Sequence, residues 1–122
     1  MKIAIISLIG ALAITACAER ETWSAVGSPP QTNPTAERTL SYLNNVDEVR
    51  WYVVDGANAY VAFAHRPHDW MDVVRAATVS ASRATGGTFT VWAISAGVHD
   101  RSWRPSVGNY FTKITARNGA VR

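Results

Sequence analysis

The chain of 122 residues has one cysteine, Cys17, and its only lysines are Lys2 and Lys113. A single thiol cannot form a disulfide within the chain, so the folded part depends on its apolar core. The longest uncharged apolar run, Ile3 to Ile14, falls short of the roughly 20 residues that span a bilayer. The net charge is only +3 and the arginines are scattered, which argues against a nucleic-acid partner.

Sequence motifs of two large enzyme classes are also missing. No serine stands in a Gly-x-Ser-x-Gly pattern, the signature of the nucleophile elbow of hydrolases. The pair Gly86-Gly87 follows a helical pattern, where glycines end a helix, and it does not form a phosphate-binding motif. We therefore expect no catalytic activity and no cofactor.

The N-terminus has the layout of an export signal: Lys2, the apolar run, small residues and then the charged stretch Glu19-Arg20-Glu21. The segment Ile14-Thr15-Ala16-Cys17 resembles the lipobox of bacterial lipoprotein precursors. The resemblance implies that residues 1–16 form a signal peptide that is removed. It also implies that Cys17 becomes the acylated first residue, which leaves no thiol for catalysis or metal binding. An ordinary secretory signal, cleaved at a small-x-small pattern of Thr15, Ala16 and Ala18, is the alternative.

The resemblance also implies where the protein is held. Two or more acyl chains anchor a protein stably, whereas one holds it only marginally. Ala18 is not the aspartate that typically retains lipoproteins at the inner membrane. A host with two membranes would therefore carry the protein on its outer membrane, facing the periplasm.

Residues 17–35 are expected to form the lipidated N-terminus and a flexible tether. Three prolines, a glycine and several small polar residues keep this segment from packing. Trp23 is the exception, and two interpretations remain open. Its ring can lie among lipid headgroups, which suit amphipathic aromatic rings, or it can fold back onto the domain.

Residues 36–122 are expected to form a single small domain. The pattern predicts a helix over 36–45 with Thr35 as its N-cap, and a hairpin of strands at 49–54 and 59–65. In the first strand, Val49, Trp51 and Val53 should share one face. A longer helix over 66–84 should bury a stripe comprising Trp70, Val73, Val74, Ala77 and Ala81. Strands at 88–95 and 109–117 follow, joined by a long loop.

This α-β-β-α-β-β order predicts an α+β fold. We expect a two-layer sandwich with a mostly antiparallel four-stranded sheet and two helices on one face. Unpaired edge strands leave dimerisation by sheet extension open. The element order resembles that of the BON domain, a small periplasmic domain associated with phospholipid surfaces.

Histidines and aspartates provide one set of candidate site residues. His65 and His68 have the spacing of a metal-binding pair, and Asp69, His99 or Asp100 would complete the ligand set if the chain brought them together. The alternative is that these are ordinary solvated loop residues and that Asp69 only starts a helix. The sequence does not decide whether His65 and His99 meet.

The loop over residues 96–108 is the stronger candidate because it is long for a hairpin connection and contains Arg101, Trp103 and Arg104. Tryptophan and arginine dominate the hot spots of protein interfaces. Trp103 can contact a partner, or it can fold back and close the end of a small core.

Three functions from different classes follow. The first is a non-enzymatic lipoprotein module that binds an envelope protein through the loop. The second is a periplasmic module that binds phospholipid surfaces. The third is a small metal-binding or hydrolytic protein that uses the His/Asp cluster.

Overall fold

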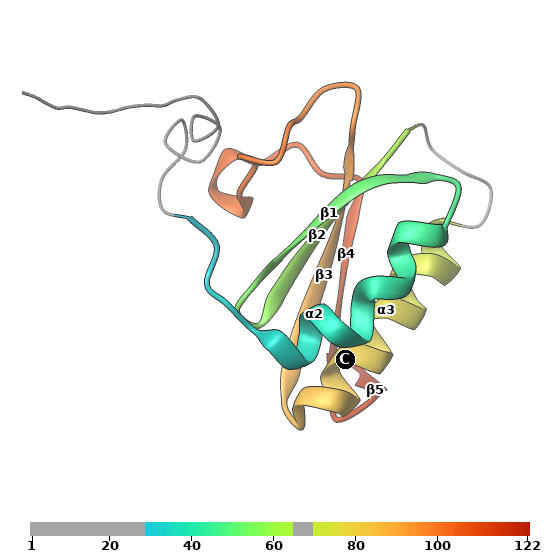
Figure 1. The fold of residues 1–122 in the computed structure, drawn as a ribbon, viewed down its shortest axis with the longest axis vertical. Helices are drawn as coiled ribbons and strands as arrows, with labels where there is room; N and C mark the ends of the chain where they lie inside the picture. The colour runs from blue at the N-terminus through green and yellow to red at the C-terminus, as the bar shows by residue number, and fades with distance from the viewer. Residues whose placement is uncertain (1–28, 65–69) are drawn as a thin grey trace, which may run out of the picture.

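The structure is a computed structural model that describes residues 29–64 and 70–122 (Figure 1). The described residues form two α-helices, two short 3-10 helices and five strands. In order they are α2 (Pro34–Leu40), η2 (Ser41–Asn45), β1 (Val49–Asp55), β2 (Asn58–Phe63), α3 (Trp70–Thr85), β3 (Thr88–Ser95), η3 (Pro105–Val107), β4 (Thr112–Arg117) and β5 (Ala120–Val121). Among these residues, no helix combines the length and apolar character that crossing a bilayer takes.

The sheet is mixed, with its five strands in the order β1-β2-β3-β4-β5. The pairs β1–β2, β3–β4 and β4–β5 are antiparallel, but β2 and β3 are parallel. A parallel pair needs a long crossover, and α3 lies within the connection that provides it. The predicted combination of two helices with a mostly antiparallel sheet is confirmed. The predicted α-β-β-α-β-β order with four strands differs in detail, because the chain adds β5 after β4 and the central pair of strands is parallel.

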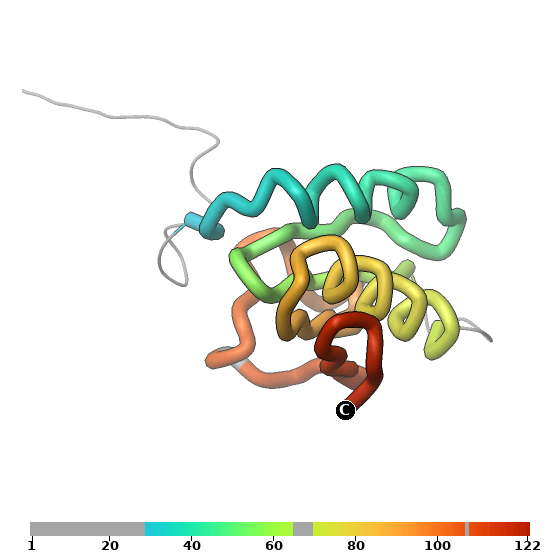
Figure 2. The backbone as a smooth tube through the Cα atoms, turned by 90° about the horizontal axis from the view of Figure 1, so that it is seen from below, coloured from blue at the N-terminus to red at the C-terminus, as the bar shows by residue number. Residues whose placement is uncertain are grey.

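The two helices pack together on one face of the sheet (Figures 1 and 2). Helix α2 contacts α3, η2 contacts β1, and α3 contacts β3 and β4. Alternate strand residues point toward this layer because side chains along a strand alternate between faces. The main core contains Leu40, Leu43, Val61, Phe63, Val74, Ala77, Ala81, Phe89, Val91 and Ile114.

The buried stripe predicted for α3 is present. Val74, Ala77 and Ala81 are fully buried, and Trp70 and Val73 are partly buried against the same core. Two polar residues, Thr78 and Ser82, are also buried, and each hydroxyl donates to a backbone carbonyl in the preceding turn. Side chains this small allow α3 to lie close to the sheet.

The domain begins several residues earlier than predicted. The N-cap of α2 is Asn33, not Thr35, because the Asn33 side chain accepts a hydrogen bond of 3.2 Å from the Ala36 amide. Pro34 then occupies the first turn, where a missing N–H has no cost. Gln31 is also fixed, since its carbonyl accepts from the Gly56 amide at 2.9 Å. The last residues assigned to the tether thus belong to the folded domain.

Strand β1 contains an irregularity that changes its faces. The pairing with β2 shifts between Val49 and Trp51, which places a bulge at Arg50. Val49 packs with the helix-side core, whereas Trp51 and Val53 pack on the opposite face. The prediction that these three side chains share one face is therefore wrong, because the extra residue reverses the alternation.

The C-terminal part also differs from the prediction. The fourth strand starts at Thr112, not at 109, so the loop between β3 and β4 covers residues 96–111. We call this segment the long loop. Asn118 and Gly119 have φ values of 50° and 87° and form the two-residue turn into β5. Positive φ at both central positions is the geometry that Asn-Gly favours in hairpins.

Candidate binding surface

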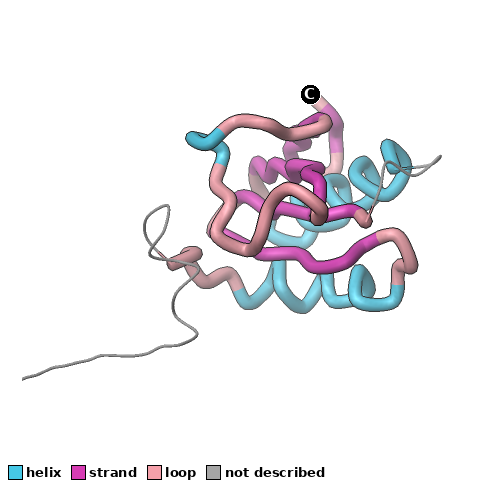
Figure 3. The backbone as a smooth tube through the Cα atoms, turned by 90° about the horizontal axis from the view of Figure 1, so that it is seen from above, coloured by secondary structure: helices cyan, strands magenta, loops and turns pink. Residues whose placement is uncertain are grey.

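The long loop covers the face of the sheet that the helices leave open (Figure 3). Because strand residues alternate, β2 and β3 place Tyr60, Ala62, Trp92 and Ile94 on this second face. These side chains would present an apolar surface to water if nothing covered them. The loop packs Trp103 onto them and completes a second, smaller core.

Trp103 is held from several directions and is only 2% exposed. Its ring lies edge-on to Tyr60, with the ring centroids 5.3 Å apart, and tilted against Trp92 at 5.9 Å. The indole Nε1–H donates a hydrogen bond of 2.7 Å to the Gly108 carbonyl. Trp103 therefore closes the second core, the alternative that the sequence had left open.

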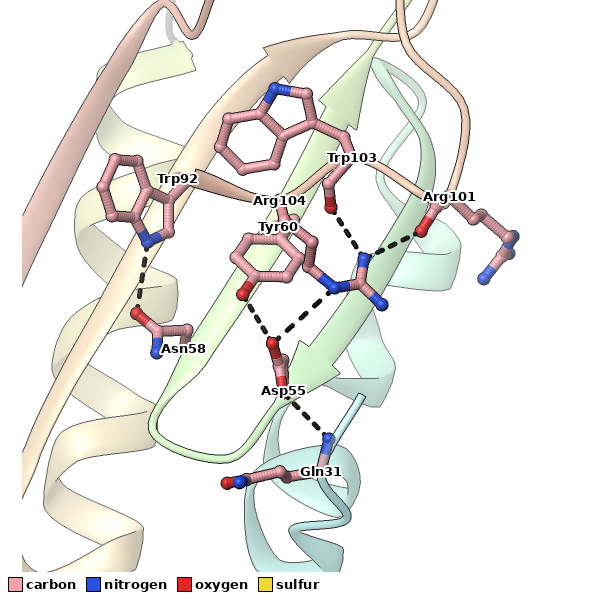
Figure 4. A network of polar contacts seen from close by, with 8 residues as sticks. All are labelled: Gln31, Asp55, Asn58, Tyr60, Trp92, Arg101, Trp103 and Arg104. Atoms are coloured by element: carbon pink, nitrogen blue, oxygen red, sulfur yellow. Dashed lines mark hydrogen bonds and ion pairs between the residues drawn. The ribbon is translucent and has the colours of Figure 1, made fainter. Parts of the chain in front are cut away.

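A polar network beside Trp103 centres on the carboxylate of Asp55 (Figure 4). The Tyr60 hydroxyl donates to Asp55 Oδ2 at 2.6 Å, and Arg104 Nε lies 3.9 Å from the same oxygen. Asp55 Oδ1 accepts from the Gln31 amide at 2.8 Å. One carboxylate thus joins the first hairpin, the long loop and the point where the chain enters the domain.

The network changes the acidity of Tyr60. Burial and the adjacent Asp55 carboxylate raise the pKa of the Tyr60 hydroxyl well above its ordinary value of 10.0, and the positive charge of Arg104 offsets only part of this. The hydroxyl is therefore a hydrogen-bond donor across the physiological pH range.

The three predicted contact residues have different environments. Trp103 and Arg104 are buried, and Arg104 Nη1 donates to the carbonyls of Arg101 and Trp103 at 3.1 and 2.7 Å. Arg101 alone is exposed, and in Figure 4 its side chain points away from the cluster. Its guanidinium donates to the Tyr52 carbonyl at 3.3 Å and lies over the Trp51 ring, 5.7 Å from the centroid. Of the three, only Arg101 is exposed to solvent.

The two ends of the long loop form an open pocket of about 440 Å³. Val98 and Tyr110, two of the exposed large apolar side chains, both line it, with exposed fractions of 74% and 42%. The Tyr110 ring packs edge-on against Trp92, with a centroid distance of 4.9 Å and an interplanar angle of 89°. The remaining lining residues are Ser95, His99, Asn109 and Phe111.

The backbone at the rim of this pocket has an unusual conformation. Gly108 and Asn109 have φ values of 79° and 59°, in the region that glycine and asparagine tolerate best. Two side chains hold the turn: Trp103 donates to the Gly108 carbonyl, and the Nε2 of His99 lies 2.9 Å from the Asn109 carbonyl oxygen. Because a carbonyl only accepts, the His99 Nε2 carries the proton in this contact.

The predicted metal ligands are not brought together in the part of the chain that the structure describes. His65, His68 and Asp69 lie outside the described residues. His99 is bonded to the loop backbone, and Asp100 accepts from the hydroxyl and amide of Ser102, which lowers the pKa of Asp100. Among the described residues, no group of three His, Cys, Asp or Glu side chains could hold a metal ion.

Several residues of this surface were not among the predicted ones. Asp55 lies between the two strands predicted for the first hairpin, and Tyr60 lies in a strand that is apolar on both faces, so nothing singled out the pair. Val98 and Tyr110 are twelve positions apart, and their meeting depends on how the loop folds. The sequence feature that came nearest to indicating this surface was the length of the loop.

Comparisons of the chain with family models, curated proteins and solved structures gave no match. Cys17 and Trp23 lie outside the described residues.

Proposed function

We propose that this protein is a lipid-anchored, non-enzymatic binding module of the bacterial cell envelope. Acyl chains on Cys17 would hold it at the membrane, on the periplasmic side of the outer membrane in a host with two membranes. The long loop would contact an envelope protein. The single observation that supports this role most is the meeting of Val98 and Tyr110 at one open pocket.

The geometry favours recognition because the pocket stands on a rigid support. Trp103, Arg104 and Asp55 fix the middle of the loop onto the sheet, so the loop ends are positioned before any partner arrives. Preorganised loops on a stable scaffold lose less conformational entropy on binding. Exposed apolar residues that gather beside polar ones are also typical of contact surfaces.

The function can be tested by capturing partners from native envelopes after crosslinking. The double variant Val98→Ser, Tyr110→Ser removes the apolar pair and should lose the partners that the parent protein captures. A matched control, Tyr42→Ser with Val121→Ser, removes two side chains that are 39% and 47% exposed on η2 and β5. The control should keep the partners.

Both variants must first show the far-UV circular dichroism and the cooperative urea unfolding of the parent. If the folded pocket variant captures the same proteins as the parent, the assignment of the loop pocket is wrong. Loss of partners in both variants would also contradict it, because the effect would not be specific to the loop.

A further inference from the structure

Strand β1 lies at one edge of the sheet, with β2 on one side only. Asp55 and Asn58 flank the two-residue turn and pair with each other, so hydrogen-bonded pairs recur at every second residue along the hairpin. By this alternation, the backbone groups of Tyr52 and Val54 face away from β2. The hydrogen bond from Arg101 to the Tyr52 carbonyl agrees with that direction.

Two hollows border β1, and the second extends across the ends of β2 and β3. One has a volume of about 380 Å³ and is lined by Pro30, Glu37, Tyr52, Val53, Val54 and Arg101. The other has a volume of about 360 Å³ and is lined by Arg50, Trp51, Ala64, Ala96 and Gly97. Together their linings include every residue of β1 from Arg50 to Val54. Arg101 stands between them, since it lines the first hollow and its guanidinium lies over the Trp51 ring in the second.

The charges along the edge are uneven. Arg50 and Arg101 are both exposed, and neither forms an ion pair with a carboxylate of the described residues. Glu37 lines the first hollow together with Arg101. The two exposed arginines outnumber this one carboxylate, so the edge favours a segment that carries an acidic side chain.

We propose that the edge of β1 binds an extended peptide segment of a partner protein, which adds to the sheet as a further strand and places an acidic side chain against Arg101. Strand addition takes its affinity from main-chain hydrogen bonds and its specificity from side-chain pockets. Here the main-chain groups belong to Tyr52 and Val54, and the two hollows receive the side chains. The site is separate from the loop pocket and does not depend on it.

Arg101 has two roles in this arrangement. Without a peptide, its guanidinium occupies the Tyr52 carbonyl and closes the edge, as charged residues on edge strands do to prevent unwanted pairing. An incoming carboxylate offers the guanidinium a charge-assisted bidentate contact, which is stronger than its 3.3 Å bond to a neutral carbonyl. Arg101 then turns to the carboxylate and leaves the Tyr52 carbonyl to an N–H of the peptide.

The test uses the full mature chain in detergent and a randomised heptapeptide library. Selection should enrich one position in Asp or Glu, flanked by β-branched or aromatic residues. The variant Arg101→Glu should shift the enrichment at that position to Lys or Arg. The matched control Arg75→Glu makes the same charge change on an exposed residue of α3 and should leave the enrichment unchanged.

A second measurement distinguishes strand addition from a contact made by side chains alone. The strongest selected peptide is compared with analogues N-methylated at single positions. Methylation at alternate positions should weaken binding by about tenfold or more, since it removes a main-chain hydrogen bond and clashes with the edge. In hydrogen exchange, the amides of Tyr52 and Val54 should become protected only when the unmethylated peptide is bound.

Four results would overturn the proposal. The first is a library that yields no binder, and the second is an enrichment that Arg101→Glu leaves unchanged. The third is equal affinity for the methylated and unmethylated peptides. The fourth is a dimer in light scattering without peptide, with the amides of Tyr52 and Val54 already protected from exchange, since the edge would then belong to a homodimer.

Discussion

Trp103 packs the long loop against the sheet. Its ring packs against Tyr60 and Trp92, and its N–H fixes the Gly108 carbonyl at the rim of the loop pocket. The side chain of Arg101, two residues earlier, contacts the edge of the sheet and remains exposed. Neighbouring residues of one loop thus have separate tasks, and single substitutions can distinguish them.

We expect Trp103→Ala to destabilise the domain by about 3–5 kcal/mol, the usual cost of truncating a buried aromatic side chain. Arg101→Ala should change the free energy of unfolding by less than about 0.5 kcal/mol, as exposed substitutions usually do. Urea denaturation followed by far-UV circular dichroism measures both. Equal stabilities of the two variants would show that Trp103 does not belong to the core.

The raised pKa of Tyr60 predicts that the folded domain loses stability at high pH. An unfolded tyrosine ionises near pH 10, whereas burial and Asp55 raise the pKa of Tyr60 in the folded domain. The contribution of Tyr60 is therefore complete below pH 10 and declines above it, by up to about 1.4 kcal/mol per pH unit. Tyr60→Phe should cost about 1–2 kcal/mol at pH 7 through the lost hydrogen bond to Asp55.

The difference between the parent and Tyr60→Phe should shrink as the pH rises from 9 to 11, because the variant has no hydroxyl to titrate at this position. Urea midpoints measured at intervals across that range give the result directly. A difference that stays constant up to pH 11 would mean that Tyr60 ionises equally easily in both states.

The residues that sequence patterns identified best are those whose role depends on local spacing. The alternatives for Trp103 were stated correctly, but choosing between them required the position of Tyr60 and Trp92 on the second face. That position depends on strand register, which no local pattern fixes when a strand is apolar on both sides. Asp55 was missed because its partners Gln31 and Arg104 are distant from it in sequence.

For helices and strands, the sequence pattern was most informative where the hydrophobic periodicity was strong. Strand β3 was predicted with its observed limits, and the buried stripe of α3 is confirmed over its described part. The errors in strand faces and strand direction arise from how neighbouring elements pair and connect. The bulge at Arg50 reversed the faces of β1, and the crossover through α3 made β2 and β3 parallel.

The start of α2 gives a prediction for an element as a whole. Asn33 caps the helix through its side-chain oxygen and also donates through Nδ2 to the Gly56 carbonyl at 2.7 Å. Asn33→Ala loses both bonds and should destabilise the domain by about 1–3 kcal/mol. Asn33→Asp keeps an oxygen for the cap but loses the donor, so its stability should lie between those of Ala and the parent.

Thermal and urea unfolding of the three proteins provide the measurement. If Asn33→Asp is as unstable as Asn33→Ala, the cap contributes nothing and the bond to Gly56 accounts for the whole effect. If both variants match the parent, the docking of this segment onto the first hairpin does not contribute to stability.

The whole molecule combines a small domain with a short connection to its proposed anchor. The chain becomes fixed at Gln31, which is held by Asp55 and Gly56 at the end of the first hairpin. From Cys17 to Pro30 a fully extended chain reaches at most about 50 Å, at roughly 3.6 Å per residue. If Cys17 is acylated, partners of both the loop pocket and the β1 edge must lie within that distance of the membrane, plus the size of the domain.

The last prediction concerns the anchor itself. The parent protein, expressed in a bacterium with two membranes, should partition into the detergent phase, and mass spectrometry should find Cys17 acylated at the mature N-terminus. Cys17→Ser should appear in the aqueous phase because it has no site for the lipid, and two or more acyl chains are what make anchoring stable.

Ala18→Asp provides a matched control: it should keep the lipid but move the protein to the inner membrane. If the parent instead partitions into water and its mature N-terminus carries no acylated Cys17, the signal is an ordinary secretory one. The search for partners would then extend to the whole exported compartment.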